Sequence, residues 1–171
     1  MMKRWILLLL FITNMFGSDF NIELTNETLM FNTTIKHYIQ DNNSVGLRGD
    51  YLYYDNENRS NYFNIGAEVE GKLEFYNSKF SIFMDYSHIK NSSALPIGFG
   101  FLFPQNKKFV NVEVGYAPKV LSFDEADKFF KAKIELGIVP IKKVHLILGY
   151  RVITFKKNYQ SNLYLGAGFS F

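Results

Sequence analysis

The sequence contains no cysteine, which excludes disulfide bonds, thiolate chemistry and the acylation that anchors a lipoprotein. It also has little net charge: the formal charge is +3, and Lys3 and Arg4 supply two of these positive charges. The rest of the chain is nearly neutral, so we expect no nucleic-acid partner. Histidine is sparse as well, and no His/Cys cluster has the spacing of metal ligands, so we expect no metal and no other cofactor.

Only the first residues contain a long apolar run. Lys3 and Arg4 precede an apolar stretch over residues 5–13, and Gly17 and Ser18 are small residues that a signal peptidase can accept. The stretch is well short of the ~20 residues of a membrane-spanning helix. We therefore predict a secretory signal over residues 1–18 and a mature domain over residues 19–171. That domain is either soluble and exported or crosses a membrane with strands.

Segments of strand composition alternate with polar turns along the mature chain. Their lengths are close to the ~9–11 residues with which a tilted strand crosses a bilayer. Residues 19–44 also alternate, and their phase flips across residues 26–28, as at a hairpin tip. This stretch predicts two further strands and ten in total, whereas a periplasmic arm here would leave eight. The eight other segments are residues 45–54, 62–74, 80–89, 94–104, 109–118, 128–140, 144–154 and 162–171.

The two faces of these strands differ in polarity. One face carries only apolar, aromatic and small residues, whereas the other collects the charges together with many glycines. A soluble barrel would turn the apolar face inward, and a transmembrane barrel would turn it toward lipid. In the second case the charged residues form a polar network in the lumen. Its members are Arg48, Asp50, Glu68, Glu70, Lys72, Asp85, Glu113, Lys131, Lys133, Glu135 and Arg151.

The aromatic residues favour the transmembrane alternative. With the C-terminal strand running toward the periplasm, aromatic side chains of the apolar face fall into two bands near the strand ends, like the girdles at the two membrane interfaces. A soluble core has no reason to sort its aromatics in this way. The outer band comprises Tyr53, Tyr86, Tyr116, Phe130 and Tyr150, and the inner band Phe80, Phe103 and Phe171.

The glycines and the last residue point the same way. Glycines of the polar face leave room for long side chains in a narrow lumen, whereas a solvated surface gains nothing from residues that weaken strands. The closing alternation "LYLGAGFSF" ends on Phe171, as in many outer-membrane barrels of Gram-negative bacteria, where it resembles the signal for the assembly machinery. We predict an all-β, antiparallel up-and-down transmembrane β-barrel in the bacterial outer membrane.

The second half of the chain resembles the YfaZ family of small outer-membrane proteins. The resemblance lies in "YAPKVLSFDEA" (116–126), "PIKKVHLILGYR" (140–151) and "LYLGAGFSF" (163–171). It covers residues 109–171 and is loose before them, where residues 19–43 lack the glycines common in the family. The resemblance implies a small outer-membrane barrel, and it implies no catalytic residue.

Three functions remain open at this point. Balanced charges in a narrow lumen favour a filled barrel with a structural or interfacial role, and the alternatives are a narrow passive pore and a lipid-modifying or hydrolytic enzyme. An enzyme needs Ser or Asp beside His88 at the outer rim, but parity places Asp85 and Ser87 on the opposite face, so we predict no catalytic residue. The expected partners are outer-membrane lipid, lipopolysaccharide and the barrel assembly machinery. Lys156 and Lys157 are either phosphate contacts or part of a solvated loop.

Overall fold

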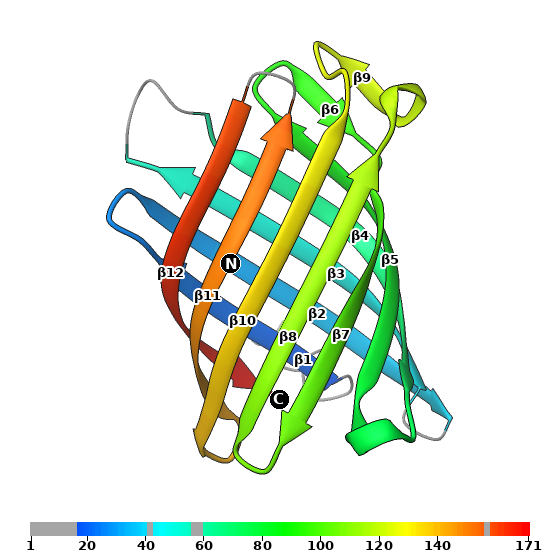
Figure 1. Ribbon diagram of the computed structural model, residues 1–171, viewed down its shortest axis with the longest axis vertical. Helices are drawn as coiled ribbons and strands as arrows, with labels where there is room; N and C mark the ends of the chain where they lie inside the picture. Colours follow the sequence, from blue (N-terminus) through cyan, green and yellow to red (C-terminus); the bar gives the residue numbers. More distant parts are fainter. Residues whose placement is uncertain (1–16, 41–42, 56–59, 156–157) are drawn as a thin grey trace, which may run out of the picture.

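The computed structural model describes residues 17–40, 43–55, 60–155 and 158–171. Within these ranges the chain is almost entirely β-structure, and ten strands form the barrel wall (Figure 1). Residues 1–16 lie outside the described part, so the secretory signal stays a prediction. The wall strands are β1 (Gly17–Leu24), β2 (Thr28–Gln40), β3 (Asn43–Tyr54), β4 (Tyr62–Lys72), β5 (Lys79–Ile89), β7 (Ile97–Gln105), β8 (Lys108–Ala117), β10 (Phe129–Ile141), β11 (Val144–Phe155) and β12 (Asn158–Ser170).

The strands form one closed antiparallel sheet. Each wall strand pairs with the wall strands before and after it in sequence. β1 closes the ring on β12, with Phe20 opposite Phe169, and the Phe171 amide donates to the Ser18 carbonyl at 2.8 Å. Closure leaves no wall strand with a free edge. A strand in hydrocarbon must have all its backbone N–H and C=O groups paired, and closure meets this requirement. The predicted ten-stranded barrel is confirmed.

The two ends of the barrel differ in their connections. At the inner end, which carries the start of β1 and the end of β12, residues 106–107 and 142–143 form two-residue turns. At the outer end, residues 90–96 and 118–128 form longer connections. These contain the short strands β6 (Ser92–Ala94) and β9 (Ser122–Asp124). Bacterial outer-membrane barrels have short periplasmic turns and longer extracellular loops, so the inner end is the periplasmic one.

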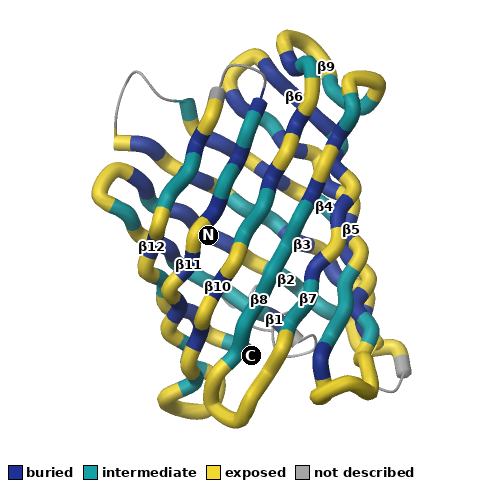
Figure 2. The backbone as a smooth tube through the Cα atoms, viewed as in Figure 1, coloured by how far each residue is buried: buried dark blue, intermediate teal, exposed yellow. Residues whose placement is uncertain are grey.

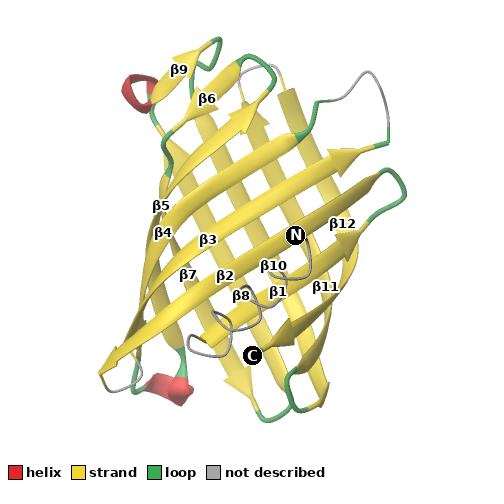
Figure 3. Ribbon diagram, turned by 180° about the vertical axis from the view of Figure 1, so that it is seen from behind, coloured by secondary structure: helices red, strands yellow, loops and turns green. Residues whose placement is uncertain are grey.

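Two short 3-10 helices lie outside the wall at opposite ends of the barrel (Figure 3). η1 (Phe75–Asn77) lies between β4 and β5 at the inner end, and η2 (Lys119–Leu121) precedes β9 at the outer end. In the described part of the chain, no helix is long and apolar enough to cross a membrane.

The segment predicted as one strand over residues 94–104 is interrupted. β6 ends at Ala94, β7 begins at Ile97, and Pro96 lies in the gap. Pro96 has no N–H to donate to a ladder, and the Asp85 amide donates to its carbonyl at 3.0 Å. β6 instead pairs with β9 and with the outer end of β5, and these two short strands form a flap at the outer end of the barrel (Figure 1).

Buried and exposed residues alternate along most wall strands (Figure 2). The exposed set is the apolar face of the sequence prediction, and it includes Leu47, Ile134 and Leu165, which are 65%, 47% and 66% exposed. The buried set includes charged side chains such as Glu23 and Asp85, which are 0% and 1% exposed. The barrel is therefore apolar outside and encloses its charged side chains in the lumen, the arrangement of a protein surrounded by lipid.

Candidate functional site

Ten residues of the predicted network lie on the lumen side of their strands and are buried or half-buried, whereas Lys72 does not join them. Lys72 is exposed at the inner end of β4, opposite Lys79 in the strand register. Parity places Lys72 on the polar face, but the last residue of a strand projects beyond the wall. The ten lumen residues are Arg48, Asp50, Glu68, Glu70, Asp85, Glu113, Lys131, Lys133, Glu135 and Arg151.

Arg48 is the centre of this network. Its guanidinium donates to Glu113 at 2.7 Å and to Glu68 at 3.5 Å, and its Nε lies 3.6 Å from Asp85. Arg48 is on β3 and Glu113 on β8, with β4, β5 and β7 between them around the wall. The ion pair therefore crosses the lumen. The Phe83 ring lies 4.3 Å from the guanidinium carbon and adds a cation–π contact.

Further ion pairs extend the network toward both ends. Lys131 bonds to Asp85, and Lys133 lies 3.4 Å from both Glu113 and Glu135. Asp85 is paired with both Lys131 and Arg48. The charges of the mid-lumen are thus largely compensated by one another.

Sequence reasoning missed four members of the lumen network. Glu23 on β1 pairs with Arg151 and accepts a hydrogen bond from Asn32 at 2.5 Å. Lys36 and Lys79 both donate to Glu70 at 2.8 Å, and the Tyr164 hydroxyl donates to Glu135 at 2.8 Å. Parity is the signal that could find Glu23, because Glu23 alternates with the apolar Ile22 and Leu24. Lys79 lies one residue before the strand predicted over residues 80–89.

Glycines of the polar face provide space for large side chains on the neighbouring strand. Gly98 is paired with Phe83 and Gly149 with Tyr164, and a Cβ on either glycine would collide with that ring. The rings therefore lie over the glycines of the adjacent strand. Such cross-strand packing fills a narrow lumen and stabilises strands that glycine would otherwise weaken.

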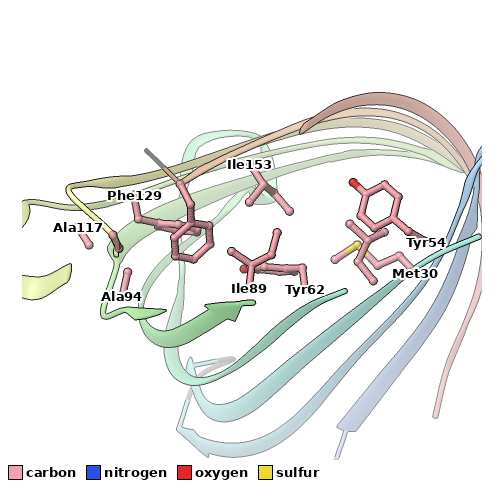
Figure 4. Close-up of a cluster of buried hydrophobic side chains, with 11 residues drawn as sticks. Met30, Tyr54, Tyr62, Ile89, Ala94, Ala117, Phe129 and Ile153 are labelled. Atoms are coloured by element: carbon pink, nitrogen blue, oxygen red, sulfur yellow. The ribbon is translucent and has the colours of Figure 1, made fainter. Parts of the chain in front are cut away.

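The outer end of the lumen is filled by an apolar cluster (Figure 4). Leu52, Phe129 and Phe155 are 0% exposed, and the Phe129 and Phe155 ring centroids are 4.5 Å apart. The labelled side chains come from β2, β3, β4, β5, β6, β8, β10 and β11 and gather inside the barrel (Figure 4). We call this set the outer plug. It comprises Met30, Leu52, Tyr54, Tyr62, Ile89, Ala94, Ala117, Ala126, Phe129, Ile153 and Phe155.

The inner half of the lumen holds a cavity of about 320 Å³. Asp19, Ser170, Asn106 and Lys108 line it, and all four lie at or near the inner ends of strands. Arg48, Glu113 and Lys133 also line the cavity, so it reaches the mid-lumen ion pairs. We call this space the inner cavity. It lies on the periplasmic side of the ion pairs, and the outer plug lies on the other side.

The outer rim brings His88 together with polar groups that the sequence did not connect to it. Ser93 Oγ lies 3.0 Å from His88 Nδ1, donates to Asp124 at 3.2 Å and accepts from the Tyr86 hydroxyl at 3.1 Å. The expectation that Ser87 would stay apart from His88 fits its burial in the lumen beside Asn64. The flap therefore supplies the serine and the acid that β5 alone does not.

The contacts at Ser93 differ from those of a catalytic triad. In a triad the acid bonds to the imidazole and orients it as the base for the serine. Here Asp124 contacts the Ser93 hydroxyl, and that hydroxyl also contacts His88 Nδ1. The arrangement fastens the flap to β5. Among the described residues, no group of three His, Asp or Glu side chains could hold a metal ion.

The predicted interface aromatics lie on the outside of the barrel. Tyr53, Tyr86, Tyr116 and Phe130 are exposed at or within three residues of the outer ends of their strands, whereas Tyr150 lies nearer the middle of β11. At the inner end, Phe103 is 38% and Phe171 51% exposed, and Phe80 is half-buried against Phe101, with ring centroids 4.9 Å apart.

Solved structures share this architecture. The KdgM porin, in a structure described as a complex with disordered oligogalacturonate, aligns with 91% of this chain and 99% of its own, with a TM-score of 0.52 and 13% identity. The translocator domain of the autotransporter NalP from Neisseria meningitidis aligns with 91% of this chain and 87% of its own, with a TM-score of 0.52 and 8% identity. The fold is that of an outer-membrane β-barrel.

No protein-family model matches the chain, and no curated protein does. At identities of 13% and 8%, the solved structures indicate a shared fold and not a shared activity. The location follows from the molecule itself. A closed antiparallel barrel with an apolar exterior and a polar lumen belongs in a bacterial outer membrane, and this protein is such a barrel.

Proposed function

We propose that the protein is a closed outer-membrane barrel with a structural or interfacial role and without a steady open pore. The observation that carries the proposal is the double obstruction of the lumen. Ion pairs such as Arg48–Glu113 cross it at mid-height, and the fully buried side chains of Leu52, Phe129 and Phe155 fill its outer end. A barrel of about eight strands has an interior just filled by side chains, and ten strands enclose a somewhat wider lumen. The large side chains of the outer plug fill the outer half of that lumen.

The second candidate is a narrow passive pore. The inner cavity favours it, because about 320 Å³ of open space already reaches the middle of the barrel. KdgM, which has a related fold, is described as a porin. A pore through this chain would require movement of the outer plug, and its walls would present charges of both signs. The closed barrel needs no such rearrangement.

Planar-bilayer recording separates the two candidates. The mature protein is inserted into a bilayer, with a known porin as the positive control. Because the outer plug obstructs the lumen, we expect no steady unit conductance from the wild type. Replacing Phe129 by alanine opens space inside the plug, whereas Phe130→Ala changes only the outer surface and is the matched control. Regular unit steps from the wild-type protein would overturn the closed-barrel proposal.

The proposed partners are those of an integral outer-membrane protein. The exposed aromatic bands are suited to the two lipid interfaces. Phe171 is exposed at the inner end of the closing strand pair, where the assembly machinery of the periplasm can reach it. Lys156 and Lys157, considered for lipopolysaccharide phosphates, lie outside the described residues. The proposal assigns no catalysis, and the contact of Asp124 with Ser93, which ties the flap to β5 through His88, supports a structural role for that cluster.

Membership of the YfaZ family is part of the same proposal and rests on the sequence resemblance. Residues of the matching segments hold the lumen together. Gly149 accommodates the Tyr164 ring, and Arg151 pairs with Glu23. Pro118 and Ala126 lie in the connection from β8 to β10 at the outer end, and the Ala126 side chain is buried in the outer plug. The segments that carry the resemblance therefore contribute to the packing of the lumen and to the outer plug.

A further inference from the structure

The exposed charges at the two ends of the barrel differ in sign. Among the described residues, the outer end exposes acids and bases in similar numbers, whereas the inner end exposes lysines and a single acid, Glu74. The exposed lysines of the inner end are Lys72, Lys107, Lys108, Lys142 and Lys143, and the exposed charges of the outer end are Glu27, Asp55, Lys90, Lys119, Asp124, Glu125 and Lys128. An anionic partner therefore meets the more favourable charge at the inner end.

Three of the inner lysines lie together in two adjacent turns. Lys107 belongs to the turn between β7 and β8, and Lys142 and Lys143 form the turn between β10 and β11. β8 and β10 are paired, and the Val139 amide of β10 donates to the Lys107 carbonyl at 2.7 Å. The two turns are therefore neighbours at the inner end. We call Lys107, Lys142 and Lys143 the basic patch.

The basic patch has no acidic partner among the described residues. In the lumen, by contrast, Lys36 and Lys79 both donate to Glu70. The three lysines of the basic patch are exposed, and none of them forms an ion pair with a described residue. Like charges in adjacent turns repel one another, and an anion bound beside them relieves that repulsion. The patch is therefore both accessible and uncompensated in charge.

The basic patch borders the apolar exterior of the barrel. Ile141, which is 69% exposed, directly precedes Lys142. The Lys143 carbonyl accepts from the Ser170 amide at 2.8 Å, one residue before Phe171 of the inner aromatic band. The patch thus lies where the lipid-facing surface ends. A lysine at this level extends its ammonium toward the headgroups while its stem stays on apolar surface.

We propose that the basic patch binds the phosphate groups of anionic phospholipids in the periplasmic leaflet of the outer membrane. The ammonium groups meet these phosphates as point charges, and the acyl chains of the same lipids lie against Ile141. A zwitterionic headgroup binds less tightly, because its own cation stands beside its phosphate. The proposal gives a lipid class and a site to the expected contact with outer-membrane lipid. It rests on the barrel spanning that membrane and not on a closed lumen.

The predicted mature chain contains no tryptophan, which allows a single fluorescent reporter. The one tryptophan, Trp5, lies in the predicted signal, so Phe103→Trp places the only indole in the inner aromatic band. The mature protein is folded into phosphatidylcholine vesicles with a small fraction of brominated lipid, which quenches indole emission on contact. We expect brominated phosphatidylglycerol to bind beside this reporter about fivefold more tightly than brominated phosphatidylcholine, the factor that one lysine contributes at an anionic surface.

A second reporter tests whether the preference is local. Tyr116→Trp places the indole in the outer aromatic band, where Tyr116 is 48% exposed. Both lipids are present in both leaflets of the vesicle, so the outer reporter meets the same mixture. We expect the two brominated lipids to quench it equally.

Variants without the lysine charges connect the preference to the basic patch. In the Phe103→Trp background, Lys107→Gln, Lys142→Gln and Lys143→Gln are combined, and the affinity ratio of the two lipids should fall to about one. Lys108 is left unchanged because it borders the inner cavity. A shift of the band on heating before electrophoresis verifies that the variant is folded.

The matched control removes the same number of exposed lysines from the outer end. It combines Lys90→Gln, Lys119→Gln and Lys128→Gln in the Phe103→Trp background. Because these lysines lie at the other end of the barrel, we expect the affinity ratio at the inner reporter to equal that of the protein with all its lysines.

Three results would overturn the proposal. One is equal quenching of the inner reporter by both brominated lipids, which is also the result expected if the patch instead docks an acidic protein. Another is the same preference at both reporters, which would indicate a general attraction of anionic lipid to the whole protein. The third is an unchanged preference in the folded variant that lacks the patch charges. If that variant does not fold, the comparison of the two reporters decides alone. None of these results bears on conductance, so the closed-barrel proposal is tested separately.

Discussion

At the scale of single residues, Arg48 shows how a lumen can hold buried charge. It is 7% exposed and has Glu113, Glu68 and Asp85 around its guanidinium, with Phe83 against one face. Removing a partner from such a group is costly, because the remaining charge stays buried without compensation. The buried ionic residues therefore stabilise the barrel only when all of them are present, and together they span the lumen.

The lipid-facing residues allow a sharper test. Ile134 is exposed in the middle of β10, and Ile141 is exposed at the inner end of the same strand. We predict that Ile134→Arg lowers the free energy of unfolding by about 2–4 kcal/mol, and that Ile141→Arg lowers it by about 0–1 kcal/mol, because the cost of arginine falls toward the interface. Urea unfolding in lipid vesicles measures both values. Equal tolerance of the two substitutions would contradict the assigned facing.

At the scale of secondary-structure elements, glycine sets how closely neighbouring strands can pack. Gly98 on β7 and Gly49 on β3 both lie within wall strands, and neither has a positive φ. A Cβ at Gly98 would collide with the Phe83 ring and with the Val114 carbonyl oxygen. A Cβ at Gly49 would have no neighbour closer than 3.7 Å. The space for a side chain is therefore blocked at Gly98 and open at Gly49.

We predict opposite effects of alanine at these positions. Gly98→Ala should destabilise the barrel by about 1–3 kcal/mol, because a backbone oxygen cannot move aside as a flexible side chain can. Gly49→Ala should be neutral or stabilise it by up to about 1 kcal/mol, since alanine weakens a strand less than glycine does. Unfolding in vesicles checks both. A Gly98 variant as stable as the Gly49 variant would exclude the packing role of this glycine.

Sequence periodicity predicted the wall strands well, because each alternation has a period of two and one face carries no charge. It placed Glu68 and Arg151 in the lumen and Ile134 outside for this reason alone. It did not predict the outer plug. Parity assigns a side chain only to the lumen face or the lipid face. Leu52, Phe129, Phe155 and Glu68 all lie on the lumen face, and only their height along the barrel axis separates the plug residues from the charged one. The ion-pair partners also depend on which strands face each other, and that is a property of closure.

At the scale of the whole molecule, the two ends of the barrel have different roles. The outer end combines the plug with a flap that Ser93, His88 and Asp124 fasten to β5. At the inner end, residues 106–107 and 142–143 form two-residue turns, the connection from β4 to β5 contains η1, and the inner cavity lies above them. Within the described residues, β1 starts and β12 ends at the inner end.

The lack of cysteine makes this orientation measurable, because a single introduced cysteine is unique. Glu125 is exposed in an outer connection, and Lys107 is exposed in an inner turn. We predict that a bulky, membrane-impermeant maleimide labels Glu125→Cys on intact cells and labels Lys107→Cys only after the outer membrane is permeabilised. The reverse pattern would mean that the barrel is inserted upside down relative to this account.

The central claim is that the apolar face of the barrel meets hydrocarbon while the ionic side chains are enclosed. The most direct test is to refold the purified mature protein with and without detergent and to compare unheated and boiled samples by electrophoresis. The account predicts a heat-modifiable, folded band only with detergent or lipid, and aggregation in buffer alone. A folded, monodisperse protein in plain buffer would contradict it.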